Sequence, residues 1–221
     1  MKRKLLIIIP SILVGVLALA VAVPFMVLGI RTGSLHKDYQ YLREDASYRV
    51  KAEANGIELV TQHISCGYAT IEMMSAYYGN KVSEDDLSSK NNGGISTSSS
   101  SGFLNEVNAS IPGKSFTKKS YLSNDELLKT IHDSLTNHNP VAIEWAAKYE
   151  GEWTLHFSLI SGLDLSNDVV TVYNPYGYIE NINVEEFIHR ATFEAFEGMP
   201  LFLSFGFAFG AFEKNTIFFA K

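Results

Sequence analysis

A long apolar run that follows a short basic cluster opens the chain. Residues Leu5–Ile30 contain no charged side chain, and they lie between Lys2-Arg3-Lys4 and Arg31. As a helix, these 26 residues would be about 39 Å long, more than the roughly 30 Å hydrocarbon thickness of a bilayer. The pattern predicts an uncleaved transmembrane signal-anchor over residues 1–31. A cleaved signal peptide is the alternative, because Ala20-Val21-Ala22 resembles a cleavage site.

The charge pattern around this run predicts how the chain is oriented. Basic residues stay on the cytoplasmic side of a membrane, so we expect a single-pass protein of the cell membrane whose body is extracytoplasmic. Residues 32–55 are mixed and charged, which indicates a juxtamembrane stalk. Residues 56–221 have the hydrophobic periodicity of a folded domain, and we expect them to form one.

Within the domain, the hydrophobic pattern predicts helices mainly in the first half and strands mainly in the second. Helical spacing and capping residues indicate one helix over Cys66–Tyr78 and three further helices that begin at Ser83, Ser123 and Asn183. Alternation of apolar and polar residues indicates three strands, over Val141–Trp145, Trp153–Ser161 and Val169–Tyr173. This order predicts an α+β fold and argues against alternating β/α units.

Two other stretches are harder to assign. Asn91–Gly102 reads NNGGISTSSSSG, which has too little apolar content to pack and predicts a flexible polar loop. Met199–Phe212 is apolar but is interrupted by proline and glycine, and its fourteen residues are too few to span a bilayer as a helix. Together with Ile217–Phe219 it predicts a terminal β-hairpin.

Charge and cysteine content narrow the possible partners. The chain is 46% hydrophobic with a formal charge of −6. The first basic cluster holds 3 of the 18 basic residues, so the rest carries 15 against 24 acidic residues, or −9. An acidic body argues against nucleic acid as a partner. A single cysteine excludes an internal disulfide and a cysteine-rich zinc site, and the histidines lack metal-ligand spacing; we predict no metal and no cofactor.

Candidate chemistry begins with that single cysteine. Cys66 opens a predicted helix, where the helix dipole and free backbone N–H groups favour a thiolate. A buried structural cysteine is the common alternative for a residue of this type. Gln62 lies four residues upstream, close enough to place its amide beside the Cys66 backbone N–H. The two groups together could form an oxyanion hole for a tetrahedral acyl intermediate.

A histidine and an asparagine lie on two strands that we expect to form a hairpin. The turn-rich segment Leu163–Asp168 joins the strands that contain His156 and Asn174. The midpoint (156 + 174)/2 = 165 lies within that turn, so the two side chains should face each other to within about a residue. The carbonyl oxygen of Asn174 could then accept from one ring nitrogen of His156 and leave the other facing a nucleophile.

These residues, in the order Gln62, Cys66, His156 and Asn174, follow the order of a papain-like cysteine peptidase. The chain most resembles the bacteriocin-processing peptidases that cut double-glycine leader peptides, and their stand-alone extracytoplasmic relatives. The stretches that carry the resemblance are QHISCGYATIEMMSAYYGNKVSEDDL, NNGGIST, NHNPVAIEW and HFSLISGLDLSNDVVTVYNPYG, within Gly56–Ile188.

The resemblance implies a papain-like fold in which a helical lobe carries the cysteine and an antiparallel sheet carries the histidine and asparagine. It implies Cys66 as nucleophile, His156 as general base, Asn174 as the residue that orients it, and Gln62 as oxyanion donor. Three features differ from the family. The glutamine there usually precedes the cysteine by five or six residues, aspartate is common at the position of Asn174, and the double-glycine enzymes are cytosolic parts of ABC exporters.

The implied function is a membrane-anchored cysteine peptidase that hydrolyses a peptide or protein substrate. Two alternatives remain open from the sequence. One is another acyl-transfer enzyme with the same triad, such as a cell-wall amidase or a transglutaminase-like enzyme. The other is a papain-like binding module without catalytic activity, in which Cys66 would be dispensable. The sequence does not indicate an oligomeric state.

Overall fold

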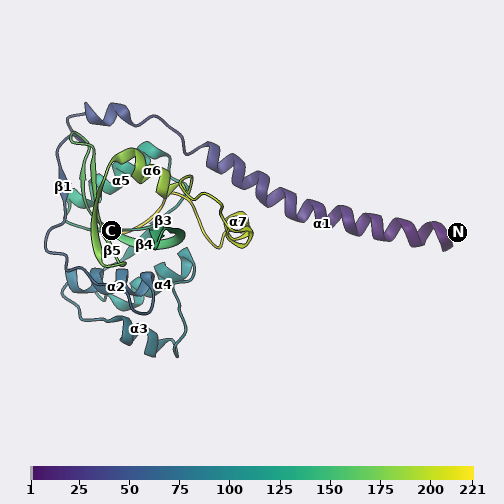
Figure 1. Ribbon diagram of the computed structural model, residues 1–221, viewed down its shortest axis with the longest axis horizontal. Helices are drawn as coiled ribbons and strands as arrows, with labels where there is room; N and C mark the ends of the chain where they lie inside the picture. Colours follow the sequence, from purple (N-terminus) through teal and green to yellow (C-terminus); the bar gives the residue numbers. More distant parts are fainter. Residues whose placement is uncertain (1) are drawn as a thin grey trace.

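One antiparallel sheet organises the domain, and helices cover both of its faces (Figure 1). The computed structural model describes residues 2–221, with side chains described from Leu13 onward. The elements, in chain order, are α1 (Lys2–Gly33), η1 (Gln40–Arg43), β1 (Ala52–Glu53), α2 (Cys66–Tyr77), α3 (Glu84–Lys90), α4 (Ser100–Ser110), β2 (Phe116–Lys119), α5 (Asn124–Thr136), β3 (Val141–Tyr149), β4 (Glu152–Asp164), β5 (Val169–Asn174), β6 (Tyr178–Ile182), α6 (Val184–Ala191), α7 (Leu201–Ala208) and β7 (Thr216–Ala220).

The strands follow the order β2-β7-β3-β4-β5-β6, and β1 pairs with β4. Every pairing between these strands is antiparallel. The three strands predicted from the sequence lie within β3, β4 and β5. The predicted α+β fold is therefore confirmed: α2, α3 and α4 come before most of the strands, and the long strands β3, β4 and β5 come later in the chain.

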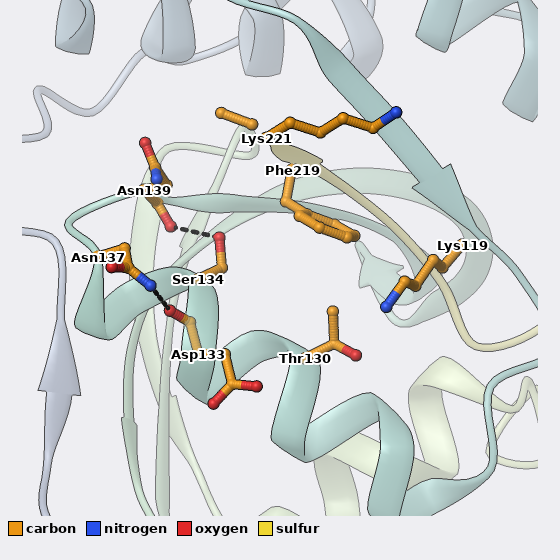
Figure 2. Close-up of a pocket in the computed structure, with 9 residues that line it drawn as sticks. Lys119, Thr130, Asp133, Ser134, Asn137, Asn139, Phe219 and Lys221 are labelled. Carbon is orange, nitrogen blue, oxygen red and sulfur yellow. Dashed lines mark hydrogen bonds between the residues drawn. The ribbon is translucent and has the colours of Figure 1, made fainter.

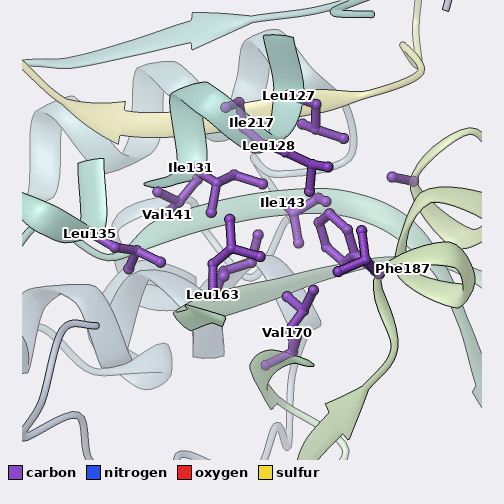
Figure 3. Close-up of a cluster of buried hydrophobic side chains, with 14 of the residues drawn as sticks. Leu127, Leu128, Ile131, Leu135, Val141, Ile143, Leu163, Val170, Phe187 and Ile217 are labelled. Atoms are coloured by element: carbon purple, nitrogen blue, oxygen red, sulfur yellow. The ribbon is translucent and has the colours of Figure 1, made fainter. Parts of the chain in front are cut away.

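Each face of the sheet has its own hydrophobic core, because successive side chains of a strand point to opposite faces. On one face, α5 and α6 pack against alternate residues of β3, β4 and β5 (Figure 3). Ile143 and Trp145 belong to this core, whereas Ala142 belongs to the opposite one. On that opposite face, α2 and α4 cover Phe157 and Leu159 of β4. The sheet is thus buried on both sides.

The capping residues confirm three of the predicted helix starts. Ser83 and Ser123 form capping boxes with Asp86 and Glu126, and the side chain of Asn183 accepts from the third backbone N–H of α6. Such a side chain satisfies one of the backbone donors that the first helical turn leaves free. The capping pattern therefore located these helix boundaries correctly.

The predicted flexible loop over Asn91–Gly102 is wrong. Its last residues begin α4, and Ser96 and Thr97 pack against α2. Glu106 explains the order: its carboxylate accepts from the side chains of Lys90, Asn91 and Ser96. Hydrogen bonds to a buried carboxylate therefore hold this polar segment in place, although it has few apolar side chains to pack.

The predicted terminal β-hairpin is also wrong. β7 forms, but its partners are β2 and β3, and the preceding apolar stretch folds into the helix α7. Leu203 and Phe207, one turn apart, are buried against Phe193 and Phe196, so helical spacing suits the surface that α7 packs on. Pro200 stands directly before the first helical residue, where its missing backbone N–H costs the helix no hydrogen bond.

The segment that we expected to be a stalk packs against the domain. Leu35 and Leu42 are fully buried, and Ala52 and Glu53 of β1 pair with the last residues of the inner strand β4. Charged and apolar residues alternate in this segment because it runs along the surface of the domain and buries only a few side chains. The folded unit therefore begins close to the end of α1.

Candidate active site

Cys66 is the first residue of α2, as predicted. Ser65 caps the helix, because its side chain accepts a hydrogen bond from the backbone N–H of Tyr68 at 3.2 Å. The backbone N–H of Cys66 has no acceptor within the helix, as is general for the first helical turn. This position leaves the N–H available to a ligand beside the Cys66 side chain.

A glutamate that the sequence analysis did not single out holds the loop before the cysteine. The buried carboxylate of Glu84 accepts from the backbone N–H groups of His63, Ile64 and Ser65 at 2.8–3.0 Å. Its own backbone N–H donates to Glu72 at 2.7 Å. Glu84 lies in an acidic first turn next to a capping box, which masked its role in the sequence. It fixes the approach of the chain to Cys66.

The thiol environment differs from the one expected at a helix start. Although Cys66 as a residue is partly exposed, burial of its side chain raises the pKa of the thiol to about 11. Hydrogen bonds from the backbone of Phe157 and Gly67 act in the opposite direction but are outweighed. Burial therefore outweighs the helix start, and the predicted stabilised thiolate is not found. The contact with Phe157 places the sulfur beside the strand that carries His156.

His156 and Asn174 meet across β4 and β5, as the hairpin argument predicted. The distance between His156 Nε2 and Asn174 Oδ1 is 2.9 Å, and both residues are fully buried. The strand register is offset from the midpoint estimate, because Leu159 pairs with Tyr173 (159 + 173 = 332, against 156 + 174 = 330); a β-bulge at Ile160–Gly162 reduces the offset that the turn sets. The two side chains therefore meet diagonally along the ladder.

The imidazole of His156 has one free nitrogen in a closed environment. Its Nδ1 is buried and has no hydrogen-bond partner among the described residues. The ring stacks on Tyr176 with 4.0 Å between centroids, and burial raises the pKa of the Tyr176 hydroxyl. Burial lowers the pKa of His156 to about 3. At neutral pH, both the thiol and the imidazole are uncharged.

The backbone of Gln62 contacts the turn that follows Asn174. Its N–H donates to the carbonyl of Pro175 at 2.7 Å, directly after Asn174. Its side-chain Oε1 is buried without a partner in the described part of the chain. Gly177 supports this contact: it has φ +97°, and a Cβ there would lie 3.0 Å from Thr61 Oγ1. The structure thus brings the segment of Gln62 to the turn that follows Asn174.

A second buried acid lies near the cysteine. Glu144 on β3 is fully buried; its Oε2 accepts from Ser100 Oγ at 2.5 Å, and its Oε1 has no partner among the described residues. Burial raises the pKa of Glu144 to about 8, so its carboxyl is protonated at neutral pH. Its negative charge at higher pH would raise the pKa of Cys66 further. The sequence showed Glu144 only as a charged residue inside an apolar strand.

A separate pocket of about 530 Å³ lies away from these residues (Figure 2). It lies between the end of α5 and β7, where Ser134 donates to the carbonyl of Asn139 and Phe219 forms the wall. None of the four candidate residues lines it. Among the described side chains, no group of three or more His, Cys, Asp or Glu residues is placed to hold a metal ion.

Comparisons with known proteins place the chain in a family. A solved structure that resembles it is a double glycine motif protease from an AMS/PCAT transporter in complex with the leader peptide, with 17% identity, a TM-score of 0.49, and coverage of 77% of this chain and 98% of that chain. No curated protein matches the chain. The model of the Peptidase_C39 like family matches residues 54–199, which include all four candidate residues. The chain belongs to the Peptidase_C39 like family, which is related to papain-like cysteine peptidases.

Proposed function

We propose that this protein is a membrane-anchored, extracytoplasmic cysteine peptidase that uses Cys66, His156 and Asn174 as a catalytic triad. The observation that carries the proposal is the state of His156. One ring nitrogen is bonded to Asn174, and the other is buried without a partner among the described residues. His156 directly precedes Phe157, whose backbone contacts the Cys66 sulfur. Acyl transfer requires an oriented base with one free nitrogen that reaches the nucleophile; Nδ1 forms no hydrogen bond to the Cys66 sulfur among the described contacts, and in the proposal the two meet as the peptide carbonyl is attacked.

The uncharged pair implies when the proton moves. Cys66 is a thiol in the free protein, so it loses its proton to Nδ1 of His156 as the sulfur attacks the peptide carbonyl. The protonated His156 then donates that proton to the leaving amine, and water hydrolyses the thioester. The backbone N–H of Cys66 and the side-chain amide of Gln62 would stabilise the oxyanion. Asn174 stabilises the imidazolium through its carbonyl oxygen.

The first prediction concerns cleavage itself. The full chain in lipid nanodiscs, incubated with a library of natural peptides, is expected to generate new peptide termini that mass spectrometry detects. Cys66→Ala removes the attacking sulfur and should abolish these products. Muropeptides incubated in parallel test the amidase alternative. Products formed equally by the Cys66→Ala chain, or cleavage of muropeptides alone, would contradict the peptidase proposal; no products from either chain would favour a binding module.

The membrane part of the proposal is supported by α1 and α7 together. Leu13–Gly33 is long and apolar enough to cross a membrane and is not buried by the rest of the protein. α7 packs beside the last turns of α1, where Phe25 and Phe205 are in edge contact at 5.3 Å (Figure 1). On α7, Leu201 is 77% exposed and Phe202 is 71% exposed. This continuous apolar surface suits a domain that rests against a bilayer.

The second prediction tests the anchor. After cell fractionation and an alkaline carbonate wash, the full chain is expected in the membrane pellet with its N-terminus intact by mass. Leu17→Arg combined with Leu19→Arg should move it to the soluble fraction, because each arginine costs about 3 kcal/mol at the centre of a span. Val50→Arg is the matched control, since Val50 is exposed outside the span. A soluble chain that begins after residue 22 would instead indicate a cleaved signal peptide.

A further inference from the structure

Behind Asn174 lies a second layer of charged residues that the triad itself does not include. Asn174 Nδ2 donates to Glu180 Oε1 at 2.7 Å. Arg190 donates to both oxygens of the same carboxylate, at 2.6 and 3.1 Å. The guanidinium is itself held by the carbonyl of Ala146 at 2.8 Å and by the face of Trp145, 3.6 Å from the ring centroid. The side chain of Arg190 is 4% exposed, so the ion pair between Arg190 and Glu180 is buried, and salt in the solvent weakens it little.

These contacts determine which way the amide of Asn174 points. The backbone N–H of Tyr176 is a donor and lies 2.9 Å from Asn174 Oδ1, which must therefore be the carbonyl oxygen. The carboxylate of Glu180 accepts, so the group that faces it must be the NH2. Oδ1 then also faces His156, and the ring nitrogen that meets it, Nε2, must carry the proton. Nδ1 is left as the free base.

We propose that Glu180 and Arg190 are positioning residues that fix the amide of Asn174 and, through it, the Nε2–H tautomer of His156. The catalytic meaning of this tautomer rests on the proposed function above. The inference also explains why an asparagine serves at this position. An aspartate at 174 would place a second carboxylate 2.7 Å from that of Glu180, with no proton between them. The negative charge that an aspartate would add at position 174 is already present on Glu180, where the guanidinium of Arg190 neutralises it.

The inference makes a specific prediction for Glu180→Gln. Because Arg190 only donates, the new side chain must turn its carbonyl oxygen to the guanidinium and its NH2 to Asn174. The amide of Asn174 then reverses to accept from that NH2 and gives up the bond from the Tyr176 N–H, which presents NH2 to His156 and moves the ring proton to Nδ1. A protonated Nδ1 cannot accept the proton of Cys66, so hydrolysis should fall although no triad residue has changed.

A compensating pair tests the network directly. In Asn174→Asp with Glu180→Gln, the carboxylate of the new aspartate accepts from His156, Tyr176 and the new amide, and the net charge equals that of the wild type. We expect each single substitution to lower the melting temperature of the full chain by about 5 °C and the double substitution to recover most of that loss. Ring 15N shifts of His156 should report Nδ1–H in Glu180→Gln and Nε2–H in the wild type and the double variant.

Glu186→Gln is the matched control, since Glu186 also lies near Arg190, at 3.7 Å, but does not contact Asn174. It should retain the wild-type tautomer. An unchanged tautomer in Glu180→Gln, or a double variant no more stable than the singles, would overturn the inference. If the tautomer and stability change as expected while peptide cleavage does not, the positioning network stands and the catalytic role of His156 falls. The two proposals therefore fail in different ways.

Discussion

Replacing His156 with alanine is expected to lower kcat/KM for the cleaved peptide by on the order of 10³-fold or more, with little change in KM. The size follows from the neutral thiol, because burial raises the pKa of Cys66 to about 11 and leaves almost no thiolate at neutral pH. Without a base at Nδ1, the proton of the thiol has no acceptor during the attack. Steady-state kinetics on the peptide identified from the library measure the effect.

His132→Ala is the matched control for this experiment. His132 is also a buried histidine, and its Nε2 meets the carbonyl of Val50 at 2.8 Å, outside the candidate site. It should lower thermal stability yet leave kcat/KM within a few-fold of the wild type. Equal losses of activity in the two variants would show that His156 acts only through packing.

Glu144→Gln is expected to stabilise the full chain at pH 8 by on the order of 3 kcal/mol and to have little effect at pH 5. Burial raises the pKa of Glu144 to about 8. The unfolded chain releases this proton near its ordinary pKa, so the stability that the protonated carboxyl contributes is full below that pKa and is lost as the pH rises through about 8. Glutamine keeps an acceptor for Ser100 and has no charge to desolvate.

The measurement is the melting temperature of both chains in detergent between pH 5 and 8. Glu106→Gln is the contrasting control: Glu106 is also buried, but its bonds to Lys90, Ser96 and Asn91 lower its pKa. Its contribution is present above the ordinary pKa and is lost on acidification, so the same substitution should destabilise the chain at pH 8. Parallel melting curves for wild type and Glu144→Gln at every pH would show that Glu144 is not a buried neutral acid.

Local patterns were sufficient where a residue needs only its neighbours in the chain. Ser83, Ser123 and Asn183 cap their helices through contacts within one turn, so the sequence located them. The hairpin between β4 and β5 is likewise local, and the pairing of His156 with Asn174 followed from its length. The patterns failed for α7 and for residues 91–102, because their order depends on packing and hydrogen bonds with other elements.

Composition, spacing and short-range capping were enough to predict the apolar helix, the α+β order and the candidate residues, since each of these depends on nearby positions in the chain. The ionisation of the candidate residues depends instead on tertiary contacts. Burial of the side chain disfavours the expected thiolate at Cys66, and Asn174 is bonded to Glu180 of β6, which Arg190 of α6 contacts in turn. Hydrogen-bond direction and desolvation depend on what surrounds a side chain in three dimensions, and no spacing along the chain encodes them.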